Sequence, residues 1–325
     1  MSSTATLHAL PDRRPDTPAP APLRRRTGRL FVVRREVELV VNGRASGGGA
    51  TTAARATAAL RDAGARVNLH LTAHVQELAE VVRDAGDRRV VLAGGDGTIH
   101  ALANLDLPML PAAALLPAGR ANNIARALGI PVDMDAAAKL AVSGRPAPVD
   151  ALRVSTPERT LFAVEGVSAG FHAAARHRYT GENSADLAAG VRALAAELAG
   201  YRQRDVALRV DGAPLFAGPA AQVFLSNLPF FGFGFRVDPV ADHSDGRLEA
   251  VVLEAPTRRA VVGLLAAARA GRHLDRAGVT WAHATRAHLD RPLPLVADAE
   301  PLGVTTAVVT AAAGRLRLVA PEARS

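Results

Sequence analysis

The chain has 325 residues, enough for two domains of ordinary size, and its 49% apolar and 22% charged residues are a globular balance. It contains no cysteine, which excludes disulfides, thiolate metal sites and cysteine nucleophiles. Its one lysine, Lys139, follows no glycine loop, so a Walker A loop and a protein-kinase lysine are excluded as well.

Residues 1–36 predict a disordered basic arm rich in proline and arginine. They include eight arginines and three acidic residues, so the arm has a net charge of +5, out of +8 for the whole chain. The arm is either a solvated tail or a segment attracted to an anionic membrane surface. We expect no nucleic-acid partner, because the rest of the chain is near neutral and aromatic residues make up only 4%.

No apolar run is long enough to predict a membrane span, and the N-terminus lacks the apolar segment of a secretory signal. We therefore expect a cytoplasmic protein, with peripheral contact at the inner face of the membrane as an option for the basic arm. A homodimer is compatible with the sequence.

Residues 37–145 predict a doubly wound α/β domain. An alanine-rich helix ends at Gly64, and a second helix over residues 75–85 has apolar positions at three-to-four spacing. Short apolar strands alternate with these helices, which predicts a parallel sheet covered on both faces. The expected strands are residues 37–41, 67–71, 89–93 and 112–116.

Residues 146–320 predict a second, β-rich domain. One clear helix interrupts the strands, capped by Ser184 and ended by Gly200. We expect the functional site in a cleft between the two domains, and the C-terminal segment to return toward the first. The expected strands are residues 149–154, 161–164, 206–210, 221–225, 248–253 and 304–310.

The strongest chemical signal is the glycine loop Gly94-Gly95-Asp96-Gly97-Thr98, which stands between a strand and a helix. Glycines let backbone amides approach phosphate oxygens, and the helix N-terminus adds a favourable dipole. Asp96 would repel a phosphate unless a divalent cation or a proton lies between them, which indicates Mg²⁺-nucleotide chemistry. The alternative is a tight turn with a helix-capping aspartate.

Further short blocks accompany the glycine loop along the chain. They are Asn42 to Gly49, Thr72, Asn104, Leu116 to Ile130, Asn227 to Gly246, and Asp298-Ala299-Glu300-Pro301-Leu302. Together with the glycine loop, and in this order, they resemble the diacylglycerol kinase catalytic-domain family of lipid kinases, which includes sphingosine kinases and is more distantly related to NAD kinases.

The resemblance implies transfer of the ATP γ-phosphoryl group to the hydroxyl of a lipid alcohol such as diacylglycerol or a sphingoid base, with Mg²⁺ present. It implies that Glu300 accepts the hydroxyl proton, that Asp298 supports it or the metal, and that Asp96 is also catalytic. Without a usable lysine, charge neutralisation falls to Mg²⁺, loop amides and arginines. The implied nucleotide-contacting residues are Asn42, Ser46, Gly47, Thr72, Gly94, Gly95, Asp96, Gly97, Thr98, Arg120 and Asn122.

The resemblance also implies a separate structural Mg²⁺ held by Asp242, Asp245 and the backbone carbonyl of Arg247. The same residues are compatible with a simple Asp-Gly hairpin turn. For the acidic pair at 298 and 300, a polar turn before the last strand is the corresponding alternative.

Several positions depart from the family pattern. Arg120 replaces a threonine and could still bind phosphate, whereas Ala101 and Asn123 remove carboxylates without an evident compensation. Ala299 replaces a glycine, and Glu165 stands where asparagine is common. These changes motivate a second hypothesis, a lipid- or nucleotide-binding protein of the same fold without turnover.

A third hypothesis is a serine hydrolase. Gly166-Val-Ser168-Ala-Gly170 fits the nucleophile-elbow pattern, and it follows an expected strand. The same stretch also fits the small-residue segment of the lipid-kinase family, so a reactive Ser168 is the less favoured interpretation.

Overall fold

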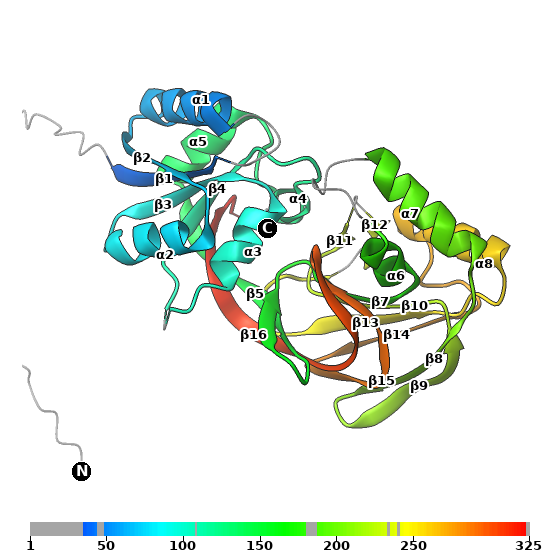
Figure 1. Cartoon of the computed structure of the whole chain (residues 1–325). Coiled ribbons are helices and arrows are strands. Elements are labelled where there is room, and N and C mark those ends of the chain that lie inside the picture. Colours follow the sequence, from blue (N-terminus) through cyan, green and yellow to red (C-terminus); the bar gives the residue numbers. More distant parts are fainter. Residues whose placement is uncertain are drawn as a thin grey trace, which may run out of the picture. The chain divides into compact units, whose positions relative to one another are not determined.

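Strands and helices alternate along the first part of the chain, as the sequence predicts. Strands β2, β1, β3 and β4 lie side by side in that order and run parallel, with helices packed against them (Figure 1). The elements are β1 (Glu36–Asn42), α1 (Gly49–Asp62), β2 (Arg66–Thr72), α2 (Val75–Asp84), β3 (Arg89–Gly94), α3 (Asp96–Ala103), β4 (Ala113–Pro117), α4 (Asn123–Ala127) and α5 (Met134–Ser143).

This computed structural model describes residues 35–43, 49–107, 109–179, 187–232, 235–238 and 241–322. All of them belong to one unit, Arg34–Ser325. The basic arm expected over residues 1–36 lies outside the described residues except for its last two positions.

Both faces of the parallel sheet are covered because successive side chains of a strand point to opposite faces. In β1, Val40 packs in one core with α2 and α3, whereas Leu39 and Val41 pack in another with α1 and α5. The helices contribute apolar residues at three-to-four spacing, such as Leu78 and Val82 of α2. This is the doubly wound arrangement predicted for the first domain.

The second part of the chain is β-rich and mostly antiparallel. Its central strands follow the order β14, β13, β10, β7, β15 and β16. The elements are β5 (Arg145–Ser155), β6 (Thr160–Ala163), β7 (Gly166–Gly170), α6 (Phe171–His177), α7 (Leu187–Ala199), β8 (Arg204–Val210), β9 (Ala213–Ala220), β10 (Gln222–Ser226), β11 (Phe230–Phe231), β12 (Phe235–Arg236), β13 (Leu248–Leu253), α8 (Arg258–Arg269), β14 (Val279–Ala284), β15 (Arg286–Ala297) and β16 (Glu300–Ala320).

The last strand joins the two parts. Strand β16 pairs antiparallel with β15 and β5, and near its end Leu318 pairs in parallel with Ala113 of β4. The sheet is therefore continuous from β2 to β14. The α/β fold class with a second, β-rich part is confirmed.

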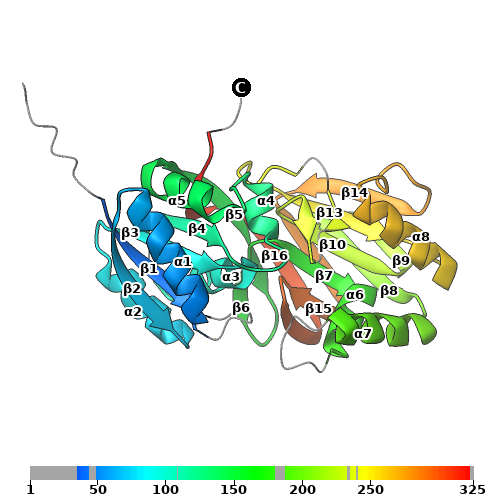
Figure 2. The same ribbon diagram turned by 90° about the horizontal axis from the view of Figure 1, so that it is seen from above.

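Helices α6, α7 and α8 cover one face of the β-rich part of the sheet, over strands β7, β10 and β13 (Figure 2). Phe171 of α6 and Leu264 of α8 share a core with Phe224 and Val251 on the strands beneath them. The sequence prediction missed the helices α4, α5, α6 and α8 and the strands β7, β9, β11, β12, β14 and β15, because their apolar runs are short or interrupted by polar residues and proline. The predicted Ser184 cap of α7 lies outside the described residues.

Candidate functional site

The glycine loop connects β3 to α3 at the carboxyl end of the parallel sheet. Gly95 touches the loop after β4 directly, since a Cβ placed on Gly95 would lie 2.9 Å from the Cα of Gly119. The Ala118 amide also donates a hydrogen bond of 2.8 Å to the carbonyl of Gly94. Gly97 is exposed, and a Cβ placed on it would meet no atom within 4 Å outside its own helix, so there is space beside this first turn of α3.

Asp96 is the first residue of α3, rather than a residue of the preceding loop as the sequence suggests. Its Oδ1 accepts a hydrogen bond of 2.9 Å from the Ile124 amide at the start of α4. Burial and the nearby charge of Asp298 raise the pKa of Asp96 despite the amide hydrogen bonds that lower it. The Asp96 carboxylate thus connects the N-termini of α3 and α4, and burial and the charge of Asp298 disfavour its ionised form.

Asp298 occupies the two-residue turn between β15 and β16, with a backbone φ of +50°. Its Oδ1 accepts hydrogen bonds from the amides of Glu165 at 2.8 Å and Gly166 at 3.1 Å, and its Oδ2 accepts one from Val164 at 2.9 Å. These donors fix the carboxylate in one orientation. Asp298 therefore acts as a positioned anion, with few lone pairs left for another partner.

His100 connects this turn to α3. Its Nδ1 lies 2.7 Å from Oδ2 of Asp298, and its Nε2 lies 3.2 Å from Oε2 of Glu300. Burial alone would lower the pKa of His100, but the hydrogen bonds and charges of both carboxylates raise it above its usual value. A protonated imidazole can donate to both carboxylates at once. Sequence analysis did not single out His100.

Glu300 has a second basic neighbour. Arg159, which lies between β5 and β6, donates from Nη1 to Oε1 of Glu300. The side chain of Glu300 is 38% exposed and that of Asp298 is 6% exposed. Of the acidic pair, Glu300 is thus the carboxylate that a substrate can reach.

Glu165 adds a third carboxylate beside Asp96 and Asp298. It is buried, and its Oε2 accepts hydrogen bonds from Nδ2 of Asn123 at 2.8 Å and from the amide of Gly232 at 3.2 Å. Burial, followed by the charges of Asp96 and Asp298, raises the pKa of Glu165 well above its usual value. Three acidic side chains from α3, β15–β16 and the start of β7 thus converge on one place.

Asn104, at the end of α3, ties this helix to β6. Its side chain donates to the carbonyl of Phe162 and accepts from the amide of the same residue, both at 2.8 Å. This pair of hydrogen bonds is of the kind that joins neighbouring strands, and it fixes the first part of the chain against the second. The family resemblance at Asn104 thus corresponds to a structural contact.

The other predicted nucleotide-contacting residues are spread over the loops at the same end of the sheet. Thr72 ends β2 and is buried, and its carbonyl accepts a 2.8 Å hydrogen bond from the Gly43 amide, next to Asn42. Asn122 has a positive φ of 47° and exchanges hydrogen bonds with Gly119. Arg120 is exposed in the same turn. Ser46 and Gly47 lie outside the described residues.

The residues predicted to hold a structural Mg²⁺ form a turn before β13. Oδ1 of Asp242 accepts hydrogen bonds of 2.9 Å from the amide and the hydroxyl of Ser244, and Oδ1 of Asp245 accepts one of 2.9 Å from the Arg247 amide. Asp150 anchors the turn by accepting from the Gly246 amide at 2.7 Å. A simple turn, the alternative given by the sequence, therefore accounts for these contacts without a cation.

Ser168 does not have the geometry of a hydrolase nucleophile. It lies within β7, fully buried between β10 and β15, rather than on an exposed turn after a strand. Its hydroxyl contacts Nδ1 of His172 and Nε2 of Gln222, each at 2.9 Å. Burial, with the charge of Arg176, lowers the pKa of His172 to about 4. This neutral histidine and Ser168 form a buried hydrogen-bond network.

An apolar cavity of about 350 Å³ opens beside α6 and α7. Exposed apolar side chains border it on α7, where Val191 is 58% and Leu194 is 37% exposed. The lining includes Phe171, His172, Tyr179, Val191, Leu194, Phe235 and Leu265, with Arg176 and Arg269 as its charged members.

The cavity is connected to the acidic group by a short chain of contacts. His172 lines the cavity, and its Nε2 is the nearest atom, at 3.8 Å, to a Cβ placed on Gly232. Gly232 in turn contacts Glu165 through its amide and Asn123 through its carbonyl. A series of contacts thus leads from the lining of the cavity to Glu165.

The fold and the site define a class of two-domain proteins in which a glycine loop on a parallel α/β sheet meets carboxylates from a β-rich second domain. Residues 36–154 match the diacylglycerol kinase catalytic domain, and residues 165–320 match the YegS C-terminal NAD kinase beta sandwich-like domain. The resemblance to the diacylglycerol kinase catalytic-domain family is therefore confirmed.

Curated relatives agree with this assignment. A probable lipid kinase YegS-like protein of Cronobacter sakazakii is 32% identical over 202 residues, which cover 58% of this chain and 65% of that protein. The probable lipid kinase YegS of Salmonella arizonae is 30% identical over 203 residues, with the same coverage. The chain thus spans just under two thirds of the length of these relatives.

Solved structures support the fold. A putative diacylglycerol kinase from Bacillus anthracis str. Sterne superposes with a TM-score of 0.69 at 19% identity, covering 89% of this chain and 98% of that one. A second structure, described as a diacylglycerol kinase from the same organism, gives a TM-score of 0.66. Among the described residues, no helix is long and apolar enough to cross a bilayer.

Proposed function

We propose that this protein is a lipid kinase that transfers the γ-phosphoryl group of ATP to the hydroxyl of a lipid alcohol such as diacylglycerol or a sphingoid base. The observation that carries the proposal is the bridge from His100 on α3 to Asp298 and Glu300. It joins the helix that follows the glycine loop to the exposed carboxylate suited to accept a hydroxyl proton. The family of the two domains agrees with this reaction.

The residues present fit ATP and Mg²⁺. Gly97 is exposed in the first turn of α3, where helix N-terminal amides can meet phosphate oxygens. Asp96 supplies an oxygen donor of the kind that Mg²⁺ prefers, and a cation beside it would offset the repulsion from Asp298. ATP supplies the phosphoryl group, and Mg²⁺ offsets the phosphate charge when both are bound.

The protein's own residues would handle the proton of the lipid hydroxyl. Glu300 accepts it as the oxygen becomes bonded to phosphorus, because Glu300 is the exposed member of the acidic pair. His100 and Arg159 orient the Glu300 carboxylate beforehand. Asp298 holds the imidazole of His100 through its own fixed carboxylate.

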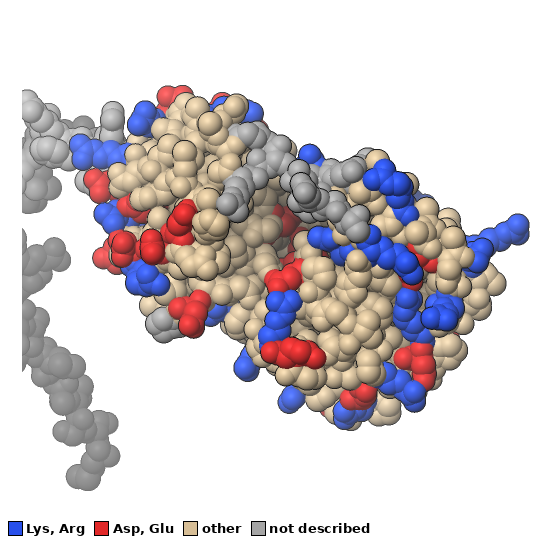
Figure 3. All heavy atoms as spheres, in the orientation of Figure 1, with Lys and Arg blue, Asp and Glu red and all other residues tan. Residues whose placement is uncertain are grey.

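The apolar cavity supports a lipid as the acceptor. Its volume and apolar lining suit part of an acyl chain, and its contact chain through His172 and Gly232 leads toward Glu165. Basic side chains gather over α6 on the face drawn in Figure 3. They favour an approach to an anionic membrane surface, from which the lipid would enter.

A binding protein without turnover is the second candidate, and one observation favours it. Asp298 is fully engaged by three backbone amides and His100, and Glu300 is paired with Arg159. If these contacts persist when lipid and nucleotide bind, no carboxylate is free to accept a proton.

One experiment separates the two candidates. The purified chain is incubated with γ-labelled ATP, Mg²⁺ and a panel of lipid extracts, and the lipid fraction is examined for label. Labelled lipid that is absent without Mg²⁺ supports the kinase. Nucleotide or lipid binding without labelled lipid supports the binding protein, and overturns the kinase proposal.

The cavity has its own test. Val191→Gln and Leu194→Gln place polar groups at its apolar border and should raise the KM for lipid at least threefold, with nucleotide affinity unchanged. Val262→Gln is the matched control, because Val262 is 51% exposed on α8 and does not line the cavity. Equal effects of all three changes would contradict a role of the cavity.

A further inference from the structure

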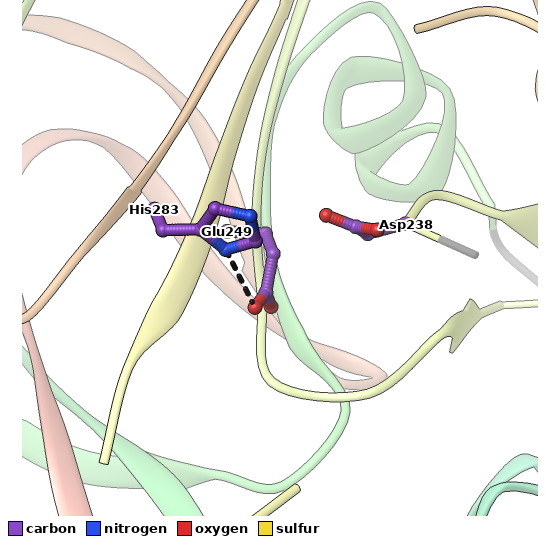
Figure 4. A group of neighbouring side chains, drawn as sticks. All are labelled: Asp238, Glu249 and His283. Carbon is purple, nitrogen blue, oxygen red and sulfur yellow. Dashed lines mark ion pairs between the residues drawn. The ribbon is translucent and has the colours of Figure 1, made fainter. Parts of the chain in front are cut away.

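Neighbouring strands bring a glutamate and a histidine together near the β14 end of the large sheet. In the antiparallel register, Glu249 of β13 lies opposite Ser226 of β10 on one side and His283 of β14 on the other. Asp238, which follows β12, approaches the same place. Ligand atoms of Asp238, Glu249 and His283 all lie within 4.8 Å of one another (Figure 4).

Glu249 is the unusual member of this group. Its side chain is 1% exposed, and neither carboxylate oxygen has a hydrogen-bond partner among the described residues. Its Oε1 lies 3.4 Å from Nδ1 of His283. A buried carboxylate without donors is costly, so its surroundings call for a proton or a cation.

The electrostatics point the same way. Asp238, Asp245 and Asp242 all place negative charge near the buried Glu249. The two aspartates of the turn before β13 therefore add to the negative potential at Glu249. A divalent cation would relieve this repulsion and supply the missing partner for the Glu249 oxygens.

We propose that Asp238, Glu249 and His283 form a binding site for one divalent transition-metal cation, with Zn²⁺ as the best fit. Two carboxylates and an imidazole are typical Zn²⁺ ligands, whereas Mg²⁺ prefers oxygen alone. Tetrahedral ligands at Zn²⁺ distances are about 3.4 Å apart, so small side-chain rotations close the present spacing. This site differs from the one expected at Asp242, Asp245 and the Arg247 carbonyl.

A cation here would have a structural role. It would tie the segment that bears Asp238 to strands β13 and β14, which bear Glu249 and His283. The same segment follows Gly232, whose backbone contacts Glu165 and Asn123 in the acidic group. The metal would thereby help to hold in place the segment that contacts Glu165 and Asn123, without touching the reacting atoms.

The test uses the full, tag-free chain after dialysis against a chelator and then against metal-free buffer. Titration with ZnCl₂ at pH 7.5 should show one bound Zn²⁺ per chain and raise the Tm by several degrees. Glu249→Gln, which keeps the shape of the side chain, should weaken Zn²⁺ binding at least tenfold. Its metal-free Tm should equal or exceed that of the wild type, because the buried acid is gone.

Two further variants make the result specific. His283→Gln should also weaken Zn²⁺ binding at least tenfold, whereas the double change Asp242→Asn and Asp245→Asn should leave it within about threefold. The proposal is overturned by absence of stoichiometric binding, by unchanged affinity in Glu249→Gln, or by loss of binding only in the double variant. The last outcome would assign the cation to the turn before β13.

Discussion

Asn123 donates a 2.8 Å hydrogen bond from Nδ2 to Oε2 of Glu165, and both side chains are buried. In the resembled family these positions are commonly an aspartate and an asparagine, so the amide and the carboxylate have exchanged places. The expectation that Asn123 removes a carboxylate without compensation is therefore wrong. The compensating residue lies 42 positions later, and only the fold brings it into contact.

This pair makes a double-mutant test possible. Asn123→Asp alone should lower the Tm by about 4–8 °C, because two buried carboxylates would then face each other. Asn123→Asp combined with Glu165→Asn restores one amide and one carboxylate, and should recover most of the loss. The measurement is thermal unfolding at pH 7. A double variant no more stable than Asn123→Asp would contradict the exchange.

Asp96 should be more important for phosphoryl transfer than for folding. Its pKa is raised in the folded protein, so the ionised carboxylate destabilises the fold at every pH above the ordinary pKa of aspartate. Asp96→Asn keeps an oxygen for the Ile124 amide and removes the charge. We expect its Tm at pH 7 to equal or exceed that of the wild type, while lipid phosphorylation is abolished. Undiminished turnover would remove Asp96 from the mechanism.

Glu300→Gln should separate binding from turnover. The amide has nearly the size of the carboxylate but cannot accept the hydroxyl proton, so the rate should fall roughly a hundredfold or more. Nucleotide affinity should stay within about threefold, measured by isothermal titration. Glu158→Gln, at a nearby exposed position, is the control and should keep the wild-type rate. A normal rate in Glu300→Gln would exclude it as the general base.

The contribution of His100 to stability should depend on pH with a defined sign. Its folded pKa lies above the unfolded value, so the stabilisation is fully present below about pH 6.5 and is lost as the pH rises through the folded pKa. The Tm difference between the wild type and His100→Gln should therefore shrink from pH 6 to pH 9. His74→Gln, at an exposed position, should show no such trend. A difference that stays constant or grows with pH would contradict the pairing with Asp298 and Glu300.

Local patterns in the sequence predicted most of the first part of the fold, except for α4 and α5. Short apolar runs predicted β1 to β4 within one or two residues, and three-to-four spacing predicted α2, because these periodicities follow from backbone geometry alone. The glycine loop was recognisable because Gly94 to Thr98 stands between a strand and a helix. The sequence also identified Asp298 and Glu300 as candidate carboxylates, but it did not predict their contacts with His100 and Arg159.

The tertiary structure decided how these pieces meet. His100 and Asp298 are 198 positions apart, and their contact depends on β16 running back along β4. The group of Asp238, Glu249 and His283 likewise depends on the register between β13 and β14. No local periodicity encodes a register between distant strands, since it is set by the packing of the whole sheet. The sequence by itself therefore determined the family, the glycine loop and the candidate carboxylates, whereas the partners that orient and charge them came from the fold.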